Sequence, residues 1–162
     1  MPIRPATKED YPSIIDVYNW AVSETVATFD TEIKSLPTHL SFFQDFEKGY
    51  PMHVLTHEEQ VIGFALIKAF SDRKAYARTS ELAIYIKPGF HRKGYGLALM
   101  NSILKAAKDF NQKVILSKIV SETIASLELH KKLGFEEVGT LKQVGYKFDR
   151  WLNVTILQKL LS

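Results

Sequence analysis

The sequence predicts a mixed α/β fold in which helices flank a central sheet. Residues 80–87 alternate apolar and other side chains with the period of a strand, whereas residues 94–110 repeat apolar side chains with the period of a helix. Near the C-terminus, two strand-like runs at 136–146 and 150–160 lie close enough in sequence to form a hairpin. Strand-like and helix-like segments thus alternate along the chain, as α/β proteins require.

Residues 1–69 predict three strands and two helices. Residues 2–6 read as a short strand, and Thr7 with Asp10 three positions later marks a helix start. That helix has an apolar face made by Ile14, Ile15, Val17, Tyr18 and Val22. After a Thr- and Ser-rich loop over 24–36, Pro37 begins a second short helix with Leu40, Phe43 and Phe46 at a spacing of three. Strands follow near 52–57 and 60–69, joined by a tight polar turn at Glu58-Glu59.

The rest of the chain predicts four more strands and two more helices. Residues 70–79 are polar and irregular, and Pro88 with Gly89 ends the strand at 80–87. After the helix at 94–110, a strand at 114–120 precedes a helix at 123–133, which Gly134 ends. The final hairpin completes a set of seven strands and four helices.

Composition indicates one globular domain over residues 1–162. Of the residues, 46% are apolar and 24% charged, which suits a folded chain. No run of 18 apolar residues and no signal peptide is present, so we expect a cytoplasmic protein without a membrane partner. The chain has no cysteine, which excludes disulfides, thiolate metal sites and a cysteine nucleophile. The histidines show no metal-ligand spacing, so no metal is expected.

The net charge of +3 and the pI near 9.0 could indicate nucleic-acid binding. However, the basic residues are spread out, and the densest groups are Arg92-Lys93 and Lys131-Lys132. A ligand with several phosphates explains the first group at least as well. We therefore expect no nucleic-acid partner.

The turn between the strand at 80–87 and the helix at 94–110 has the features of an anion site. Gly94 and Gly96 flank Tyr95, and Arg92 and Lys93 add positive charge. Glycines let backbone N–H groups approach a ligand, and the first turn of a helix leaves N–H groups free at its positive end. This arrangement predicts a phosphate or pyrophosphate site, although an ordinary strand-to-helix turn is the alternative.

Two better-known phosphate motifs do not fit this turn. A dinucleotide fingerprint needs a third small residue where this chain has Leu99. A P-loop needs Gly-Lys-Ser/Thr after four spacer residues, and the chain has no such run. What remains is a short anion cradle after a strand that carries Glu81 near its start.

Residues 91–96 (H-R-K-G-Y-G) resemble the Arg/Gln-x-x-Gly-x-Gly/Ala motif of the GNAT acetyltransferases, which holds the pyrophosphate of acetyl-coenzyme A. His91 departs from that motif at its first position. The chain also resembles the phosphinothricin acetyltransferase branch of the superfamily over nearly its whole length. The matching segments are Ile3–Thr7 with Asp10, Tyr18-Asn19, Ala27–Glu32, Arg73–Tyr76, Thr79–Glu81, Ser126–Phe135, Gly145–Lys147, Trp151 and Asn153-Val154.

The resemblance implies a GNAT-like domain with a central, mixed and mostly antiparallel sheet of about seven strands, whose middle strands splay apart to leave a slot. It implies acetyl-CoA as co-substrate, with backbone amides of Tyr85 and Ile86 serving the acetyl carbonyl and the pantetheine arm. Plain ladder groups are the alternative for those amides. The coenzyme-binding residues it implies are Ile84, Tyr85, Ile86, Lys87, Arg92, Lys93, Gly94, Tyr95, Gly96, Leu97, Ala98 and Thr123. Thr123 replaces an asparagine that is usual in the family.

Acetyl transfer needs a base for the amine, stabilisation of the thioester oxygen and a proton for the leaving thiolate. Glu81 is the candidate base, because burial in an apolar strand would raise its pKa toward neutrality; a solvent-facing glutamate is the alternative. His130 is the candidate proton donor, and a packing histidine on a helix face is the alternative. The resemblance supports both assignments.

Four residues match positions that line the acceptor pocket in the phosphinothricin branch: Phe29, Arg73, Tyr76 and Thr79. Arg73 could pair with a carboxylate or phosphinate of the acceptor. The alternatives are a loop anchor for Phe29 and a solvated cation for Arg73. Lys147 and Trp151 are expected at a subunit interface or at the pocket rim, since these enzymes are often homodimers.

The sequence therefore predicts an N-acetyltransferase that acts by direct attack on a small-molecule amine, such as the α-amine of phosphinothricin, methionine sulfoximine or methionine sulfone. The missing cysteine favours direct transfer over a cysteine-bound intermediate. A protein N-terminus, a polyamine or an aminoglycoside is an alternative acceptor. A non-catalytic acyl-coenzyme sensor is an alternative of another class.

Overall fold

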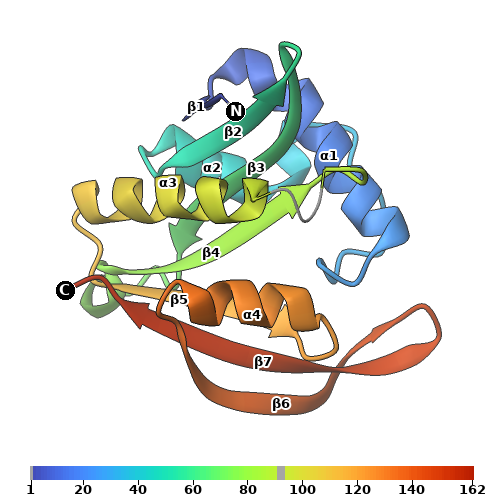
Figure 1. Ribbon diagram of the computed structural model, residues 1–162, viewed down its shortest axis with the longest axis vertical. Helices are drawn as coiled ribbons and strands as arrows, with labels where there is room; N and C mark the ends of the chain where they lie inside the picture. The colour runs from blue at the N-terminus through green and yellow to red at the C-terminus, as the bar shows by residue number, and fades with distance from the viewer. Residues whose placement is uncertain (1, 91–93) are drawn as a thin grey trace.

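A computed structural model describes residues 2–90 and 94–162. Figure 1 shows a twisted sheet with helices packed against it. The strands are β1 (Ile3–Pro5), β2 (Met52–His57), β3 (Gln60–Ala69), β4 (Thr79–Ile86), β5 (Val114–Val120), β6 (Glu136–Lys147) and β7 (Arg150–Leu160). The α-helices are α1 (Tyr11–Glu24), α2 (Ser41–Glu47), α3 (Tyr95–Asp109) and α4 (Ile124–Lys132). The predicted mixed α/β fold with seven strands and four helices is confirmed.

The strands form one sheet in the order β1-β2-β3-β4-β5-β7-β6. Every neighbouring pair is antiparallel except β4 and β5, which run parallel. Two hairpins close with two-residue turns, at Glu58-Glu59 and at Phe148-Asp149, and all four residues have positive φ. Such turns match the right-handed twist of the strands, even though none of these positions is glycine.

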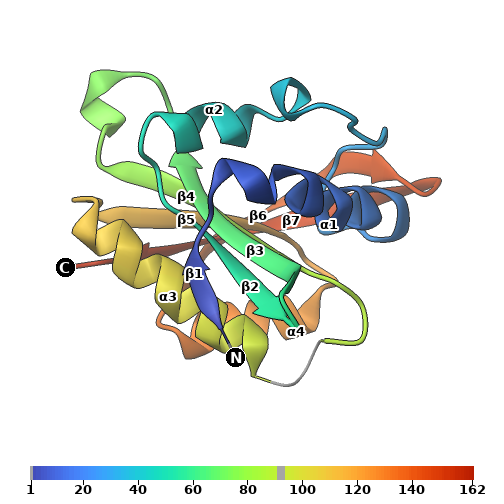
Figure 2. The same ribbon diagram turned by 90° about the horizontal axis from the view of Figure 1, so that it is seen from above.

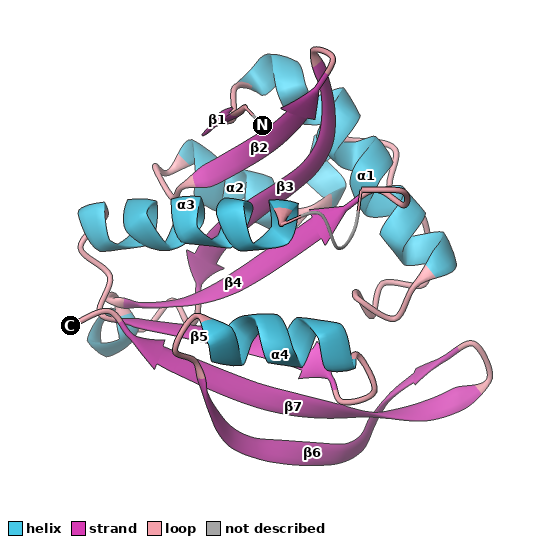
Figure 3. Cartoon of the chain, viewed as in Figure 1, coloured by secondary structure: helices cyan, strands magenta, loops and turns pink. Residues whose placement is uncertain are grey.

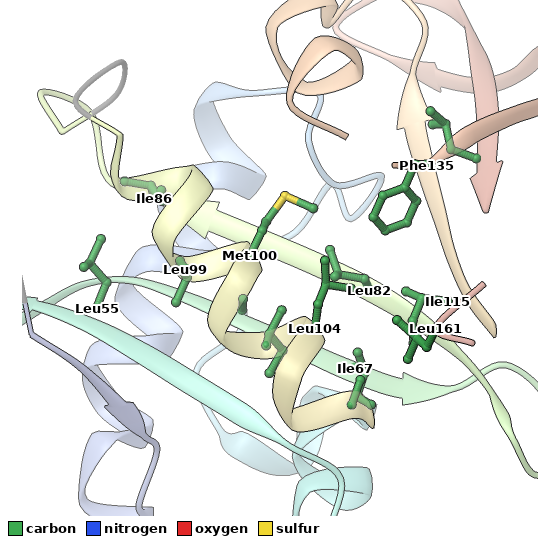
Figure 4. Close-up of a cluster of buried hydrophobic side chains, with 14 of the residues drawn as sticks. Leu55, Ile67, Leu82, Ile86, Leu99, Met100, Leu104, Ile115, Phe135 and Leu161 are labelled. Carbon is green, nitrogen blue, oxygen red and sulfur yellow. The ribbon is translucent and has the colours of Figure 1, made fainter. Parts of the chain in front are cut away.

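The two faces of the sheet carry separate cores. Figure 2 shows α1 and α2 on one side of the sheet, and α3 and α4 on the other. Beneath α3, Leu99, Met100 and Ile103 pack against Leu82 and Ile86 of β4, as the close-up in Figure 4 shows for most of these side chains. The opposite core joins α1 and α2 to β2 and β3. Because both faces are covered, the central strands are held rigidly beside the site.

Two local features differ from the predictions. The short helix expected from Pro37 is interrupted: a 3-10 turn covers Pro37–His39, and α2 begins only at Ser41. Leu40 between them has extended backbone and a buried side chain, so the apolar spacing reflects burial of this residue rather than one continuous helix. The stretch at 70–79 contains a further 3-10 turn, Lys74–Tyr76.

No helix in the described part of the chain combines the length and the apolar character needed to cross a bilayer.

Candidate active site

The site begins where β4 and β5 separate. Their parallel pairing covers only Thr79–Val114, Ser80–Ile115 and Glu81–Leu116. Beyond Glu81 the two strands diverge, and Figure 3 shows the opening between β4 and the layer formed by β5 and α4. A cavity of about 720 Å³ occupies this region. Glu81 therefore sits at the base of the fork, on the last paired position of β4.

The β3–β4 register decides which backbone groups of β4 face the opening. Lys87 donates its N–H to the carbonyl of Ile62, and residues alternate sides along an antiparallel ladder. Tyr85, two residues earlier, therefore exchanges its backbone hydrogen bonds with Phe64 of β3. Ile84 and Ile86 direct theirs toward the side from which β5 has diverged. The Tyr85 amide is thus turned toward β3, whereas the amides of Ile84 and Ile86 are turned toward the fork; the coenzyme contacts of Tyr85 and Ile86 stay predictions.

Two lysines surround the carboxylate of Glu81. Lys118 Nζ lies 3.1 Å from Oε1, and Lys68 Nζ lies 3.7 Å from Oε2. We call these three residues the Glu81 cluster. The apolar surroundings expected for Glu81 are not found, because each carboxylate oxygen has its own ammonium group.

The loop after α1 forms a second wall of the cavity, through residues 26–30. The Tyr18 hydroxyl donates to the Asp30 carboxylate and lies 2.8 Å from the Thr28 hydroxyl oxygen. Burial, together with the hydrogen bond to Asp30, raises the pKa of Tyr18, so its hydroxyl stays protonated and keeps this link. The side chain of Asn19 also bonds the backbone N–H and carbonyl of Lys34. We call residues 25–30 the acceptor loop.

The β6–β7 hairpin holds the acceptor loop from the other side. Lys147 is 3% exposed, and its Nζ donates to the carbonyl oxygens of Thr25 at 2.7 Å and Thr28 at 2.8 Å. Burial lowers the pKa of Lys147. The ring of Phe29 lies directly on Gly145, where a Cβ would come within 2.2 Å of a ring carbon. Lys147 is therefore a buried clamp on a cavity wall rather than an exposed rim or interface residue.

His130 is fully buried and uses both ring nitrogens. Nδ1 lies 2.7 Å from the carbonyl oxygen of Ser126, so this nitrogen carries the hydrogen, and Nε2 accepts from the Ser117 hydroxyl at 3.0 Å. Burial lowers the pKa of His130, which keeps the ring neutral. Through these two bonds His130 joins α4 to β5, and its role as proton donor stays a prediction.

The first turn of α3 has the geometry expected of an anion cradle. Gly94, the N-cap, has φ of 79°, and a Cβ there would meet no atom within 4 Å. Gly96 lets α3 approach α4, since a Cβ there would lie 3.3 Å from Leu129. Helix geometry leaves the N–H groups of Tyr95, Gly96 and Leu97 without carbonyl partners inside the helix. These groups fit a pyrophosphate, with Ala98 one position further along; Arg92 and Lys93 lie outside the described residues.

Several predicted site residues lie away from the cavity. Arg73 and Tyr76 are exposed on the segment before β4, where Tyr76 packs on Phe70. Thr79 pairs with Val114 in the closed part of the β4–β5 ladder, and Lys87 extends the β3–β4 ladder. The cavity is lined instead by Phe29, Glu81, Ile84, Tyr85, Thr123 and His130 among the predicted residues.

Sequence reasoning missed Lys68 and Lys118, which line the same cavity. A signal for them was present, because each is a charged residue inside an otherwise apolar strand, as Glu81 is. Tyr18 and Asp30 were likewise missed as supports of the acceptor loop. Within residues 2–90 and 94–162, no group of three or more His, Cys, Asp or Glu side chains could hold a metal ion.

Comparison with known proteins agrees with this geometry. The family model described as acetyltransferase (GNAT) domain matches residues 3–156. The L-amino acid N-acyltransferase MnaT of Escherichia coli is 33% identical over 159 residues, which cover 98% of this chain and 92% of the relative. A phosphinothricin N-acetyltransferase of Streptomyces coelicolor is 34% identical over 158 residues, covering 94% and 91%.

A solved structure extends the agreement to three dimensions. The structure of yncA from Salmonella typhimurium with its cofactor acetyl-CoA superposes with a TM-score of 0.95 at 31% identity, covering all of this chain and 94% of the other. The open fork, the glycine cradle and these similarities lead to one assignment. The chain is a GNAT-family N-acetyltransferase that uses acetyl-CoA and resembles the phosphinothricin acetyltransferases.

Proposed function

We propose that this enzyme transfers the acetyl group of acetyl-CoA to the α-amine of a small amino acid or amino-acid analogue, with Glu81 as general base. The observation that carries the proposal is the position of Glu81 at the base of the β4–β5 fork, with its carboxylate in the cavity. Similarity to an L-amino acid N-acyltransferase and to a phosphinothricin N-acetyltransferase supports the acceptor class.

Three groups of residues would hold acetyl-CoA, which supplies the thioester that is cleaved. The N–H groups of Tyr95, Gly96 and Leu97 at the start of α3 suit its pyrophosphate. The backbone groups of Ile84 and Ile86 suit the pantetheine arm and the acetyl carbonyl. Thr123, at the start of α4, lines the cavity on the far side of the fork.

Glu81 takes a proton from the acceptor ammonium, directly or through a water molecule, because an ammonium has no lone pair with which to attack. The free amine then forms a bond to the acetyl carbon. A backbone N–H of β4 donates to the carbonyl oxygen as it gains negative charge. The C–S bond breaks with its electron pair on sulfur, and the proton that the attacking nitrogen still has to lose goes to the departing thiolate, which gives the free thiol of coenzyme A.

The cavity is lined by two lysines, Lys68 and Lys118, and two carboxylates, Asp30 and Glu81, so it offers partners to both an anionic and an ammonium group of an acceptor. Lys68 and Lys118 bring two positive charges to the carboxylate of Glu81. A polyamine or an aminoglycoside carries several positive charges, which these lysines would repel. We therefore place amino-acid acceptors ahead of polycations.

The test is release of coenzyme A from acetyl-CoA with a panel of acceptors at neutral pH. L-methionine sulfone, L-methionine sulfoximine and phosphinothricin should be acetylated, while spermidine and a peptide with a free N-terminus should react far more slowly. Mass spectrometry should find the acetyl group on the α-nitrogen. Binding of acetyl-CoA without turnover on any amine would instead support a coenzyme sensor.

We also propose that two copies associate through the outer face of the β6–β7 hairpin. Tyr146 and Trp151 pair across the hairpin on the face opposite Gly145 and Lys147, and Trp151 is 63% exposed. Val138 adds further exposed apolar surface on β6. Light scattering after size exclusion should give twice the mass of 18.5 kDa, and Trp151→Lys should give the single mass.

A further inference from the structure

The contribution of ion pairs to folding stability does not explain why three charged side chains meet in the Glu81 cluster. Three ionic side chains converge from β3, β4 and β5 within strands that are otherwise largely apolar. The side chain of Lys118 is 50% exposed and that of Lys68 is 35% exposed. Ion pairs with this much solvent contact contribute little to folding. Their place in the acceptor cavity points to a role in binding.

We propose that Lys118 binds the α-carboxylate of the acceptor while Glu81 binds its α-ammonium group, so that the pair recognises the zwitterion of an α-amino acid. This inference rests on the proposed function and names the residue that selects its acceptor. Lys118 Nζ and Glu81 Oε1 are 3.1 Å apart. Standard bond lengths and angles separate the nitrogen of an amino acid from its nearer carboxylate oxygen by about 3 Å. The two charges of the acceptor therefore lie close enough together to reach Glu81 and Lys118 at once, and each is opposite in sign to its partner.

The position of Lys118 allows this exchange of partners. It lies on β5 two residues beyond Leu116, the last residue paired with β4, and thus on the stretch where the fork has opened. Its half-exposed side chain can turn from Glu81 to an incoming carboxylate, because the lysine stem is flexible. The acceptor ammonium then takes the place of the Lys118 ammonium at Oε1.

Lys68 has a different task in the cluster. It stands directly opposite Glu81 in the β3–β4 ladder and approaches the other oxygen, Oε2. It therefore keeps the Glu81 carboxylate oriented whether or not Lys118 is engaged. When the acceptor ammonium gives one proton to Oε1, the amine becomes neutral and Glu81 becomes a neutral acid, while the acceptor carboxylate stays paired with Lys118.

Arg73, the residue expected to bind the carboxylate, is exposed on the segment before β4 and does not line the cavity. A carboxylate bound by Lys118 lies beside the base, so the same contact that selects the acceptor also brings its amine to Glu81.

The test compares two acceptors that differ only in the carboxylate: L-methionine sulfone and its α-carboxamide. In Lys118→Met, kcat/KM for the amino acid should fall about 10- to 100-fold, the usual effect of losing a hydrogen bond between charged groups. For the carboxamide it should change less than about 3-fold, because that acceptor offers no anion to Lys118. Lys118→Arg should recover part of the loss. Lys105→Met, an exposed lysine on α3, is the matched control and should behave like the wild type with both acceptors.

Two further measurements separate this inference from its alternatives. The Kd for acetyl-CoA, measured by calorimetry, should be the same in the wild type and in Lys118→Met, which also shows that the variant is folded. Lys68→Met should lower kcat for both acceptors by a similar factor, because it disturbs the base and not the carboxylate contact. Equal losses for both acceptors in Lys118→Met, or no loss for either, would overturn the inference and leave the proposed function intact. A wild-type enzyme that acetylates only amines of other classes would overturn both.

Discussion

Gly145→Ala should disturb the acceptor loop without touching the base or the coenzyme site. A Cβ at this position would lie 2.2, 2.3 and 2.9 Å from three carbons of the Phe29 ring. Since ordinary carbon–carbon contacts begin near 3.4 Å, the ring must move by about 1.2 Å or more. Overpacking of this size destabilises a protein by about 1–3 kcal/mol. We expect the free energy of unfolding in urea to fall by that amount, and the KM for the acceptor to rise several-fold while the Kd for acetyl-CoA is unchanged.

A double-mutant cycle isolates the contact between the two residues. In a Phe29→Ala background the clash is absent, so adding Gly145→Ala should cost less than about 0.5 kcal/mol. The coupling between the substitutions should therefore be about 0.5–3 kcal/mol. Equal costs of Gly145→Ala in both backgrounds would show that the hairpin does not position the loop through Phe29.

Three further predictions concern other supports of the site. Lys147→Met removes both hydrogen bonds to the acceptor loop but keeps the buried apolar stem of the side chain. The free energy of unfolding should therefore fall by about 2–4 kcal/mol, and the KM for the acceptor should rise. A variant as stable in urea as the wild type would contradict the role of Lys147 in holding this loop. Burial lowers the pKa of His130, so the unfolded chain binds its proton first and stability should decline as pH falls below 6.5, by up to about 1.4 kcal/mol per unit. His53, with a pKa lowered by burial, acts in the same direction, so His130→Gln should flatten the decline in part, and an unchanged slope would argue against a neutral buried ring. Gly94→Ala places a side chain at a φ of 79°, so the free energy of unfolding should fall by about 1–2 kcal/mol and acetyl-CoA should bind more weakly. Gly139 also has open space around it but no positive φ, so Gly139→Ala should change neither quantity.

Much of the fold follows from local sequence signals. The alternation in 80–87, the helical period in 94–110 and the glycine after 123–133 each act over a few residues, and the corresponding elements form where they are expected. The interrupted helix after Pro37 shows the limit of such signals. Apolar residues at a spacing of three indicate which side chains are buried, but they do not require a helix. Leu40 is buried although its backbone is extended.

The site was predictable where a residue acts through its place on one element. Glu81 is the last residue of β4 that pairs with β5, so its position along one strand puts it at the fork. Gly94 lies in the turn that begins α3 and has a positive φ, which glycine adopts readily. Other details of the site depend on partners far away in the sequence. The direction of the Tyr85 amide is set by the register with β3, and His130 is neutralised by its burial against Ser117 of β5.

The acceptor side depends even more on distant partners. Lys118 meets Glu81 only because β5 runs parallel to β4 for three residues and then departs. Lys147 reaches the acceptor loop across 119 and 122 positions of sequence. Neither contact leaves a local pattern, although a charged residue inside an apolar strand is a signal that can be sought.

The most direct measurement of the central claim is the turnover of Glu81→Gln at neutral pH with L-methionine sulfone, alongside its affinity for acetyl-CoA. The amide keeps the size of the side chain but cannot accept the amine proton. We expect the Kd for acetyl-CoA to match the wild type and kcat to fall by about 100-fold or more, the usual contribution of a general base. Wild-type turnover in this variant would show that the residue at the base of the fork does not take the proton.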